Sequence, residues 1–379
     1  MPFNFAPIPF THWQDMLKYY YGEHMKNVQK ADDPYISTTS GNYNAVYGPF
    51  VFAALNHEAN VFAALPKPAY GQSGWRAITA RPESSWSGLG QTAAIPDTTR
   101  YTFTEISAIP KTLANTFDVS LVQQVLATTD DAIGKLSDLR MLHGTHHREM
   151  INVDLTLDYD TLSSNRLESV DRLTASSVET TNVGATAGDE DFNGVDKSAN
   201  TGWANPTVDD NSGTDRTLSK AILRGNIVDN VPEAGGSYPT LEITGHDTMS
   251  AIAGLFEAQS GVGGALGTAS VSFGMDGIQV AGAGAGLLVS TVFNVPIIVS
   301  KDVAKDTGSR IYTLDTRYVN GQGPAAACEI AFPTQYFEAG VSSGNPWAPD
   351  LVGDEGMYVT LAELRCKNFR RQGKIRDLL

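Results

Sequence analysis

The sequence predicts an α+β protein, in which helices and strands are mixed without the regular alternation of a parallel α/β sheet. Apolar residues at spacings of three and four predict a long helix over residues 120–150. Hydrophobic residues make up 41% of the 379 positions, which is enough for a core and excludes wholesale disorder. Runs rich in β-branched and aromatic residues predict strands at 75–81, 100–106, 286–300, 310–319, 325–332 and 357–369.

The balance of charge narrows the class of protein. The formal net charge is −15, from 42 acidic and 27 basic residues. A surface built mainly to coat nucleic acid needs clustered cations, so this balance tells against that class. Arginine (15) outnumbers lysine (12), and with the acidity this favours a surface suited to a salty environment.

Cysteine content and apolar runs exclude two further classes. Cys328 and Cys366 cannot form a disulfide framework, so we expect two packed thiols in a protein made in a reducing compartment. A membrane span needs about 20 consecutive apolar residues, and none occurs. Residues 1–10 lack the basic region and the long apolar core of a signal peptide.

The N-terminal region predicts an arm followed by a helix. Residues 1–10 contain three prolines and three phenylalanines, a composition typical of an extended segment that docks on a surface. Thr11 and Gln14 form a capping box for a helix over 11–29. That helix packs either on its own domain or on a neighbouring subunit; its apolar face consists of Trp13, Met16, Leu17, Tyr20, His24 and Val28.

We expect residues 66–108 to form a long two-stranded hairpin, because two β-rich runs flank a stretch rich in Ser, Gly and Pro. An isolated hairpin is marginally stable in water, so a second surface must support it. That surface is either the hairpin's own domain or an adjacent subunit. The candidate interface residues are Trp75, Ile78, Arg81, Trp86 and Leu89.

The predicted helix over 120–150 begins after a capping residue, either Asp118 or Ser120. Thirty residues at 1.5 Å each give roughly 45 Å, longer than most globular helices. A strand is expected to follow directly over 151–159. Further along, the sequence predicts a helix over 218–228, a short strand over 241–244 and a helix over 248–258.

Residues 178–216 are expected to form an acidic surface insertion, because they contain eight acidic residues and no Leu or Ile. Within them, DEDFNG at 189–194 matches the first six positions of a calcium loop. Lys197 and Asn200 stand where the later ligands should be, so the alternative is a plain acidic loop. The candidate Ca²⁺ or Mg²⁺ ligands in the 189–200 loop are Asp189, Asp191, Asn193 and the carbonyl of Val195.

The sequence offers no sharp catalytic site. The glycines at 282, 284 and 286 lack the third glycine and the following helix of a dinucleotide fingerprint, and no phosphate-binding P-loop occurs. His143 and His147 share a helix face and suit either zinc or a polar helix end, without a third ligand. We therefore expect no enzyme, although an unrecognised site stays an alternative.

A cluster of basic residues lies near the C-terminus. We expect it to contact nucleic-acid phosphates, to pair with acidic residues of a neighbouring subunit, or to form a solvated tail. Its members are Lys367, Arg370, Arg371, Lys374 and Arg376.

The order of these parts resembles the major capsid proteins of tailed viruses, with the Hong Kong 97-type fold. RYTFTEISAIPKTLANTFDVS, the long helix and INVDLTL look like the return strand of the E-loop running into the spine helix. The segment LSKAILRGNIVDNVPEAGGSYPTLEITGHDTMSAIAGLFEAQ is similar to the passage from the peripheral (P) domain into the axial (A) domain. VPIIVSKDVAKDTGSRIYTLDT and EGMYVTLAELRCKNF are similar to the A-domain strands and to the return to the P-domain sheet.

The resemblance implies a division of the chain and a function. It implies self-assembly as hexamers and pentamers into an icosahedral shell around double-stranded DNA, in a virion assembled in the host cytoplasm. Decoration, portal and scaffolding proteins are further implied partners, and no cofactor is required. An encapsulin-like compartment around a cargo enzyme shares the fold and is the alternative. The acidic composition fits a virus of a halophilic archaeon. The implied parts are an arm (1–64), an E-loop (65–109), a P-domain (110–237), an A-domain (238–340) and a return to the P-domain with the basic tail (341–379).

Overall fold

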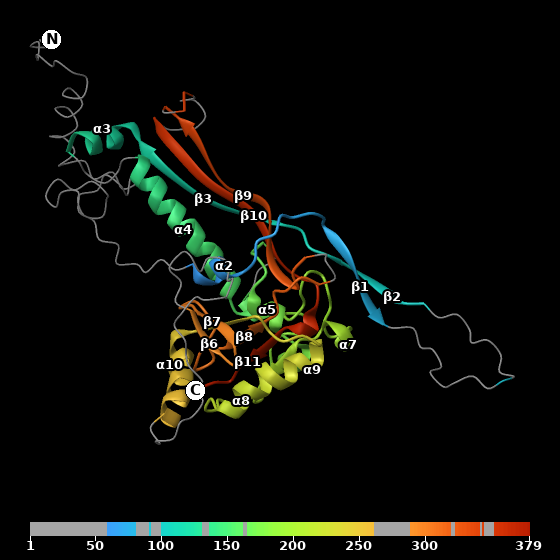
Figure 1. Cartoon of the computed structure of the whole chain (residues 1–379). Coiled ribbons are helices and arrows are strands. Elements are labelled where there is room, and N and C mark those ends of the chain that lie inside the picture. Colours follow the sequence, from blue (N-terminus) through green and yellow to red (C-terminus); the bar gives the residue numbers. More distant parts are fainter. Residues whose placement is uncertain are drawn as a thin grey trace, which may run out of the picture. The chain divides into compact units, whose positions relative to one another are not determined.

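Helices and strands follow one another without regular alternation, so the predicted α+β class is confirmed (Figure 1). The computed structural model describes residues 59–80, 91, 100–130, 136–161, 165–260, 289–319, 323–341, 343–344 and 352–379. The predicted arm with its helix over 11–29 and the glycine-rich run at 261–288 lie outside them.

The described residues divide into two compact units. The first takes residues between 114 and 147 and between 334 and 359; the second takes those between 59 and 113, between 148 and 333 and between 360 and 379. Four elements have residues in both units: β3 (Lys111–Ser120), α4 (Leu136–Thr156), β9 (Ala326–Gly340) and β10 (Gly353–Cys366). Each unit is described by itself.

A six-stranded mixed sheet organises the second unit, with strand order β4-β11-β8-β5-β7-β6. Parallel pairs join β11 to β4 and β5 to β7, and antiparallel pairs join the other neighbours. The strands are β4 (Thr207–Asp209), β5 (Leu241–Thr244), β6 (Val289–Val292), β7 (Val295–Val299), β8 (Ile311–Leu314) and β11 (Gly373–Ile375).

Both faces of this sheet are covered, which explains why its central strands β5 and β8 are buried at every position, although β5 alternates apolar and polar residues. Leu241 and Ile243 of β5 join one core cluster, together with their partners on β8. Ile311 and Ile375 point to the opposite face and join a second cluster. That second cluster also receives side chains from α8 (Lys220–Arg224), the π-helical turn η2 (Gly225–Asn230) and α10 (His246–Ser260).

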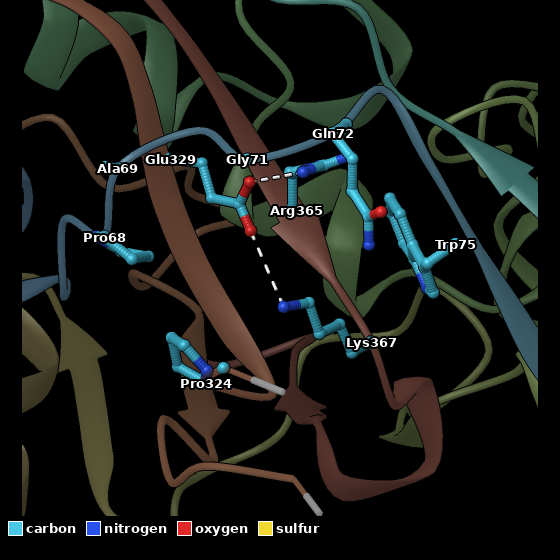
Figure 2. A pocket seen from close by; sticks show the side chains of 10 residues that line it. Pro68, Ala69, Gly71, Gln72, Trp75, Pro324, Glu329, Arg365 and Lys367 are labelled. Atoms are coloured by element: carbon cyan, nitrogen blue, oxygen red, sulfur yellow. Dashed lines mark hydrogen bonds and ion pairs between the residues drawn. The ribbon is translucent and has the colours of Figure 1, made fainter. Parts of the chain in front are cut away.

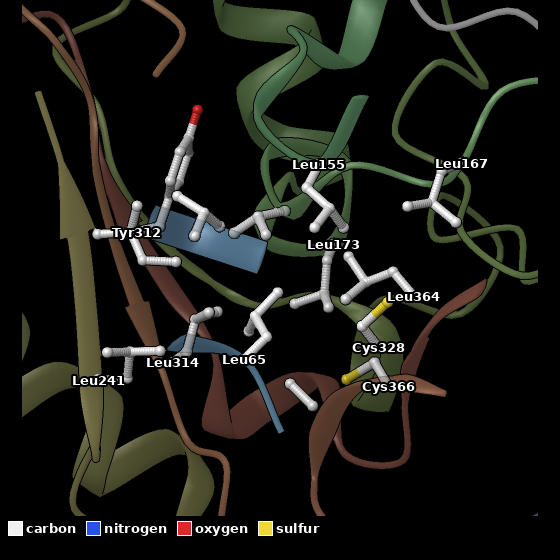
Figure 3. Close-up of a cluster of buried hydrophobic side chains, with 14 of the residues drawn as sticks. Leu65, Leu155, Leu167, Leu173, Leu241, Tyr312, Leu314, Cys328, Leu364 and Cys366 are labelled. Atoms are coloured by element: carbon white, nitrogen blue, oxygen red, sulfur yellow. The ribbon is translucent and has the colours of Figure 1, made fainter. Parts of the chain in front are cut away.

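The larger core cluster collects side chains from distant parts of the chain (Figure 3). Leu155, Leu173 and Leu314 meet there with no exposed surface. Cys328 and Cys366 lie in the same cluster as free thiols, so the prediction of packed cysteines is confirmed. This cluster also receives side chains from the short helices α2 (Asn60–Ala64), α5 (Val170–Thr174) and α7 (Thr201–Ala204) and from the turn η4 (Phe369–Arg371). The other short helices are the turn η1 (Tyr159–Thr161), α6 (Ser177–Val183) and α9 (Val231–Gly235).

The strand predicted over 151–159 is wrong, because α4 continues as a helix to Thr156. The run INVDLTLDY alternates apolar and polar residues, but the buried pair is Ile151 and Leu155, at helical spacing. Asn152 adds a further function on this turn. Its side-chain oxygen accepts the backbone N–H groups of Val61 and Phe62, at 3.0 and 3.1 Å, and so caps the start of α2.

The single helix predicted over 120–150 is described as two helices, α3 (Leu121–Asp130) and α4, and residues 131–135 between them lie outside the described residues. In the first unit, α3 begins after a capping residue, as predicted, because the Ser120 hydroxyl accepts the Gln123 N–H at 3.2 Å. The strand β3 before it was not predicted, although Phe117 and Val119 alternate in the way that a half-buried strand requires. It belongs to a three-stranded sheet with order β3-β10-β9.

Residues 178–216 are not the surface insertion that their composition predicts. Phe192, Val195 and Ala204 lie in the larger core cluster, and β4 forms an edge of the six-stranded sheet. A capping box between Ser176 and Glu179 starts α6. The segment has no Leu or Ile, yet a few aromatic and small side chains, with paired charges, suffice to bury it.

We expect Leu155→Ala to lower the free energy of unfolding by about 2–5 kcal/mol, because Leu155 is fully buried and the substitution leaves a cavity. The matched control is Leu142→Ala on the same helix, where the side chain is 40% exposed and the loss should be small. Chemical denaturation of unassembled protein measures both. Equal losses would contradict this placement of α4.

Candidate assembly surface

The predicted hairpin exists as an antiparallel ribbon of β1 (Gly74–Ala80) and β2 (Thr102–Ser107). Directly opposed residues share a face, so Trp75 and Ile106 point to one side. Ile78 and Phe103 point to the other side. Of the other predicted interface residues, Arg81, Trp86 and Leu89 lie outside the described residues.

The outer face of the ribbon combines apolar and charged pairs. Ile78 is 58% exposed and its partner Phe103 is 57% exposed. Beside them Arg76 and Glu105 form an ion pair of 2.9 Å that is largely solvated. In the described part of the chain, no further layer covers this face. That a neighbouring copy covers it stays a prediction.

Trp75 does not belong to that outer face. Its ring packs against the larger core cluster of its own unit, and the Arg365 guanidinium lies over it at 4.5 Å. Trp75 therefore packs on its own unit, one of the two supporting surfaces that the sequence left open for the hairpin. The strand period explains the difference, because Trp75 and Ile78 are three residues apart and so fall on opposite faces.

The C-terminal basic cluster is largely internal. Lys374 has no exposed surface, and its ammonium group contacts Glu179 at 2.6 Å and Asp171 at 3.1 Å. Arg376 reaches Glu179 and Asp306, both at 2.8 Å. For Lys374 and Arg376 the predicted contact with nucleic acid or a neighbouring subunit is wrong, because acids of the same unit already bind them.

The other three basic residues differ in exposure. Lys367 lies 3.7 Å from Glu329, and Arg371 lies 3.3 Å from Asp315. Arg370 is exposed and donates to the Gly202 carbonyl at 3.0 Å. Their contact with nucleic acid or with another subunit stays a prediction.

A buried ion network surrounds Asp171. Its carboxylate forms ion pairs with Arg310 at 2.8 Å and Lys374 at 3.1 Å, and it accepts a hydrogen bond from the Tyr159 N–H at 3.0 Å. Burial alone would raise the pKa of Asp171, but Lys374 and Arg310 hold it well below its ordinary value. Asp158 behaves oppositely: burial, with the nearby Asp171 charge, raises its pKa to about 6 despite Arg310.

The four predicted cation ligands are partly committed to the protein. The Val195 carbonyl accepts the Phe192 N–H at 3.2 Å, and the Asn193 side chain donates to the Leu364 carbonyl at 3.3 Å. An Asp191 oxygen accepts the Lys197 N–H at 3.0 Å. Among the described residues, no group of three or more His, Cys, Asp or Glu side chains could hold a metal ion. The Ca²⁺ or Mg²⁺ site at Asp189, Asp191, Asn193 and Val195 stays a prediction, and these contacts do not favour it.

Lys197, which breaks the calcium-loop pattern, stabilises a helix end instead. Its buried ammonium group donates to the carbonyls of Arg172, Leu173 and Ala175, at 2.8, 3.0 and 2.7 Å. These are terminal carbonyls of α5, where a cation also complements the helix dipole. Burial lowers the pKa of Lys197 to about 7. Position nine of the motif thus serves packing rather than ion binding.

The histidines do not lie at a helix end, because α4 runs nine residues beyond His147. His143 stacks on Phe117 with ring centroids 4.6 Å apart, and His147 lies 6.1 Å from the Tyr358 ring. Burial lowers the pKa of both histidines.

None of the helices in the described part of the chain is long and apolar enough to cross a membrane.

Removing the ammonium group of Lys374 leaves the buried carboxylates of Asp171 and Glu179 without this counter-charge. We therefore expect Lys374→Met to lower the free energy of unfolding by about 3–5 kcal/mol. Arg370→Met, which removes an exposed positive charge four residues away, is the control and should change little. Chemical denaturation compares the two. Similar values would contradict the internal placement of the C-terminal strand.

A second prediction concerns pH. Burial raises the pKa of Glu363 from 4.5 to about 8. The folded chain therefore retains this proton when the unfolded chain has released it. The stabilisation is complete below about pH 4.5 and is lost as the pH rises to about 8. We expect the melting temperature of Glu363→Gln, relative to the unsubstituted chain, to increase steadily across that window. The exposed Glu355→Gln is the control, and a parallel pH profile for all three chains would refute the assignment.

Comparison with solved structures finds the same fold in proteins of very different sequence. The Cyanophage A-1(L) capsid asymmetric unit is 13% identical with a TM-score of 0.57, over 87% of this chain and 95% of that one. The capsid of an empty GTA particle is 11% identical with a TM-score of 0.53, over 90% and 99%. The holo-SrpI encapsulin complex from Synechococcus elongatus PCC 7942 gives 8% identity and a TM-score of 0.50, over 88% and 93%.

No protein-family model and no curated protein matches the sequence. At these identities the likeness establishes the fold alone. It extends over nearly the whole length of this chain and of each of the three structures. The chain has the α+β Hong Kong 97-like capsid fold, as the resemblance of its sequence predicts.

Proposed function

We propose that the chain is the major capsid protein of a tailed virus, which self-assembles as hexamers and pentamers into an icosahedral shell around double-stranded DNA. The observation that carries the proposal is a fold shared with the Cyanophage A-1(L) capsid over 87% of this chain and 95% of that one. The protein acts as a structural component of the virion rather than as an enzyme.

The surface of the chain supports this function. The hairpin exposes a pair of large apolar side chains, Ile78 and Phe103, which no second layer covers among the residues that the structure describes. Contacts of this kind are heterologous, since the ribbon of one copy meets a different surface of the next, and such contacts give rings where the rotation between copies closes. Each contact can be weak, because every copy makes several.

Packaged DNA does not require a strongly basic chain. Lys374 and Arg376 are used inside the protein, which leaves Lys367, Arg370 and Arg371 as the basic candidates of the C-terminal cluster for contact with DNA or a neighbour. Decoration, portal and scaffolding proteins are further proposed partners. Assembly would occur in the cytoplasm of the host.

The finer proposal of a halophilic archaeal host rests on composition alone, namely the net charge of −15 and the excess of arginine over lysine. Salt screens repulsion between exposed carboxylates. A melting temperature that rises continuously to molar KCl supports this host, and one that levels off below about 0.2 M opposes it.

An encapsulin-like compartment around a cargo enzyme is the second candidate, because the holo-SrpI encapsulin complex shares the fold. The contents of particles separate the two functions. Particles from infected or producing cells should contain nuclease-protected double-stranded DNA if the chain is a viral capsid protein. A single protein cargo without DNA would favour the compartment, and a monomer without particles would oppose both.

We expect the double substitution Ile78→Asp and Phe103→Asp to leave the subunit folded but to prevent closed shells, because charged side chains would have to be buried between copies. Circular dichroism checks the fold, and electron microscopy counts the shells. Val178→Asp, at a site that is 61% exposed on α6, is the control for adding an acid to an exposed apolar position. Normal shells from the double variant would contradict the role of this face.

A further inference from the structure

The hairpin joins the rest of its unit through a short exposed segment. Before this segment the chain runs beside β9, where the Ile330 N–H donates to the Pro68 carbonyl at 3.1 Å and the Tyr70 N–H donates to the Ile330 carbonyl at 3.0 Å. Residues 71–73 then leave β9 and are exposed. A Cβ at Gly71 would meet no atom within 4 Å, and a glycine in such open space leaves the backbone free to take several directions.

Apolar contacts hold the base of the hairpin against the core without fixing its direction. Ile106 is buried in the larger core cluster, and Trp75 packs against that cluster. The burial of apolar surface is a non-directional force. Trp75 also lines a cavity of about 230 Å³, so close packing supports its ring on one side only (Figure 2). The direction of the hairpin therefore depends on directional contacts.

The guanidinium group of Arg365 supplies such contacts. Its central carbon lies 5.1 Å from the centroid of the Tyr70 ring and 4.5 Å from that of the Trp75 ring, so it contacts an aromatic ring on each side of the exposed segment. A terminal nitrogen donates to the Gln72 carbonyl, within the segment, at 2.6 Å. One planar group thus contacts the chain before, within and after the segment that leads into the hairpin.

Arg365 is itself held in the sheet. It lies on β10 with only 3% of its surface exposed, and its other terminal nitrogen pairs with Glu329 on the neighbouring strand β9 (Figure 2). Charge-assisted hydrogen bonds and cation–π contacts are stronger where water is excluded. The contacts of Arg365 therefore connect the hairpin to a fixed point in the core of the second unit.

We propose that Arg365 is a latch that fixes the direction of the hairpin relative to the core of the second unit before another copy of the chain binds. A hairpin whose direction is already fixed loses less conformational freedom when it docks, so the latch favours assembly. The role in assembly rests on the proposed function. The latch itself is a property of the single subunit and can be measured there.

Spin labels at Thr102→Cys on the hairpin and Val178→Cys on α6 report the direction of the hairpin in full-length unassembled protein, by pulsed electron paramagnetic resonance. Both positions are exposed and lie in the second unit, and the two native cysteines are buried. We expect one narrow distance distribution for the chain with an intact latch. Arg365→Lys keeps the positive charge, but an ammonium group cannot stack on two rings and bind two oxygens at once, so the distribution should broaden.

Arg376→Lys is the matched control, because Arg376 is also a buried arginine and its partners, Glu179 and Asp306, do not belong to the hairpin. Trp75→Leu keeps an apolar side chain at the base but removes the ring, and it should broaden the distribution without removing a buried charge. It decides the question if Arg365→Lys does not fold. Distributions that stay narrow in the latch variants, or that broaden equally in Arg376→Lys, would overturn the proposal.

Assembly is measured separately from the direction of the hairpin. We expect Arg365→Lys and Trp75→Leu to raise the subunit concentration at which particles form by about tenfold, because a mobile hairpin must be ordered when it docks. If the unsubstituted chain forms no particles, the proposed function fails, while the distance distributions of the subunits still decide whether the latch exists. Particles that form at an unchanged concentration from variants with broadened distributions would contradict the role of the latch in assembly.

Discussion

Asp171 is the buried charge on which much of the second unit depends. It lies on α5 with no exposed surface, and it binds Arg310 beside β8 and Lys374 on β11. These partners are 139 and 203 residues away in sequence. Moving such charges out of water is costly, and only well-placed counter-charges and hydrogen bonds repay it. The network therefore favours one pairing of the C-terminal strand over the alternatives.

The register of that strand follows from the same contacts. Lys374 is paired with Tyr312 across the sheet, which places its ammonium group on the face of α5 and α6. A shift by one residue would send Lys374 to the opposite face, into an apolar cluster. Glu179 of α6 joins Lys374 and Arg376, so ion pairs hold the acidic segment after residue 178 in the fold together with its few buried apolar side chains.

Local patterns predicted the elements that depend on local periodicity. The strand over 241–244 has the predicted bounds, and both hairpin strands lie within two residues of them. The predictions failed where contacts with residues distant in sequence decide the structure. INVDLTLDY alternates as a strand does, but α4 extends through Thr156 because Ile151 and Leu155 pack in a core cluster whose members are distant in sequence. The C-terminal basic cluster was expected to contact nucleic acid, a neighbouring subunit or solvent, because the acidic partners of Lys374 and Arg376 are about 200 residues away in sequence.

The candidate assembly surface was also predictable only in part, because local patterns show which residues share a face but not which distant residues they contact. Hairpin composition identified Ile78 as uncovered, and strand alternation could have identified Phe103 as its partner and placed Trp75 on the other face. No sequence pattern could place Trp75 beside Arg365, because that contact joins positions 290 residues apart. The calcium-loop match was a local pattern whose side chains and carbonyls the fold uses for its own hydrogen bonds.

The network around Asp171 pairs its buried charges internally, whereas the described residues leave Ile78 and Phe103 of the hairpin exposed, and this contrast supports the proposal that the chain forms a shell. A cryo-electron microscopy map of particles assembled from the full-length chain tests the assignment most directly. We expect the map to show a closed icosahedral shell in which a neighbouring copy covers Ile78 and Phe103. A closed shell in which that face points to solvent, or the absence of any closed assembly, would contradict it.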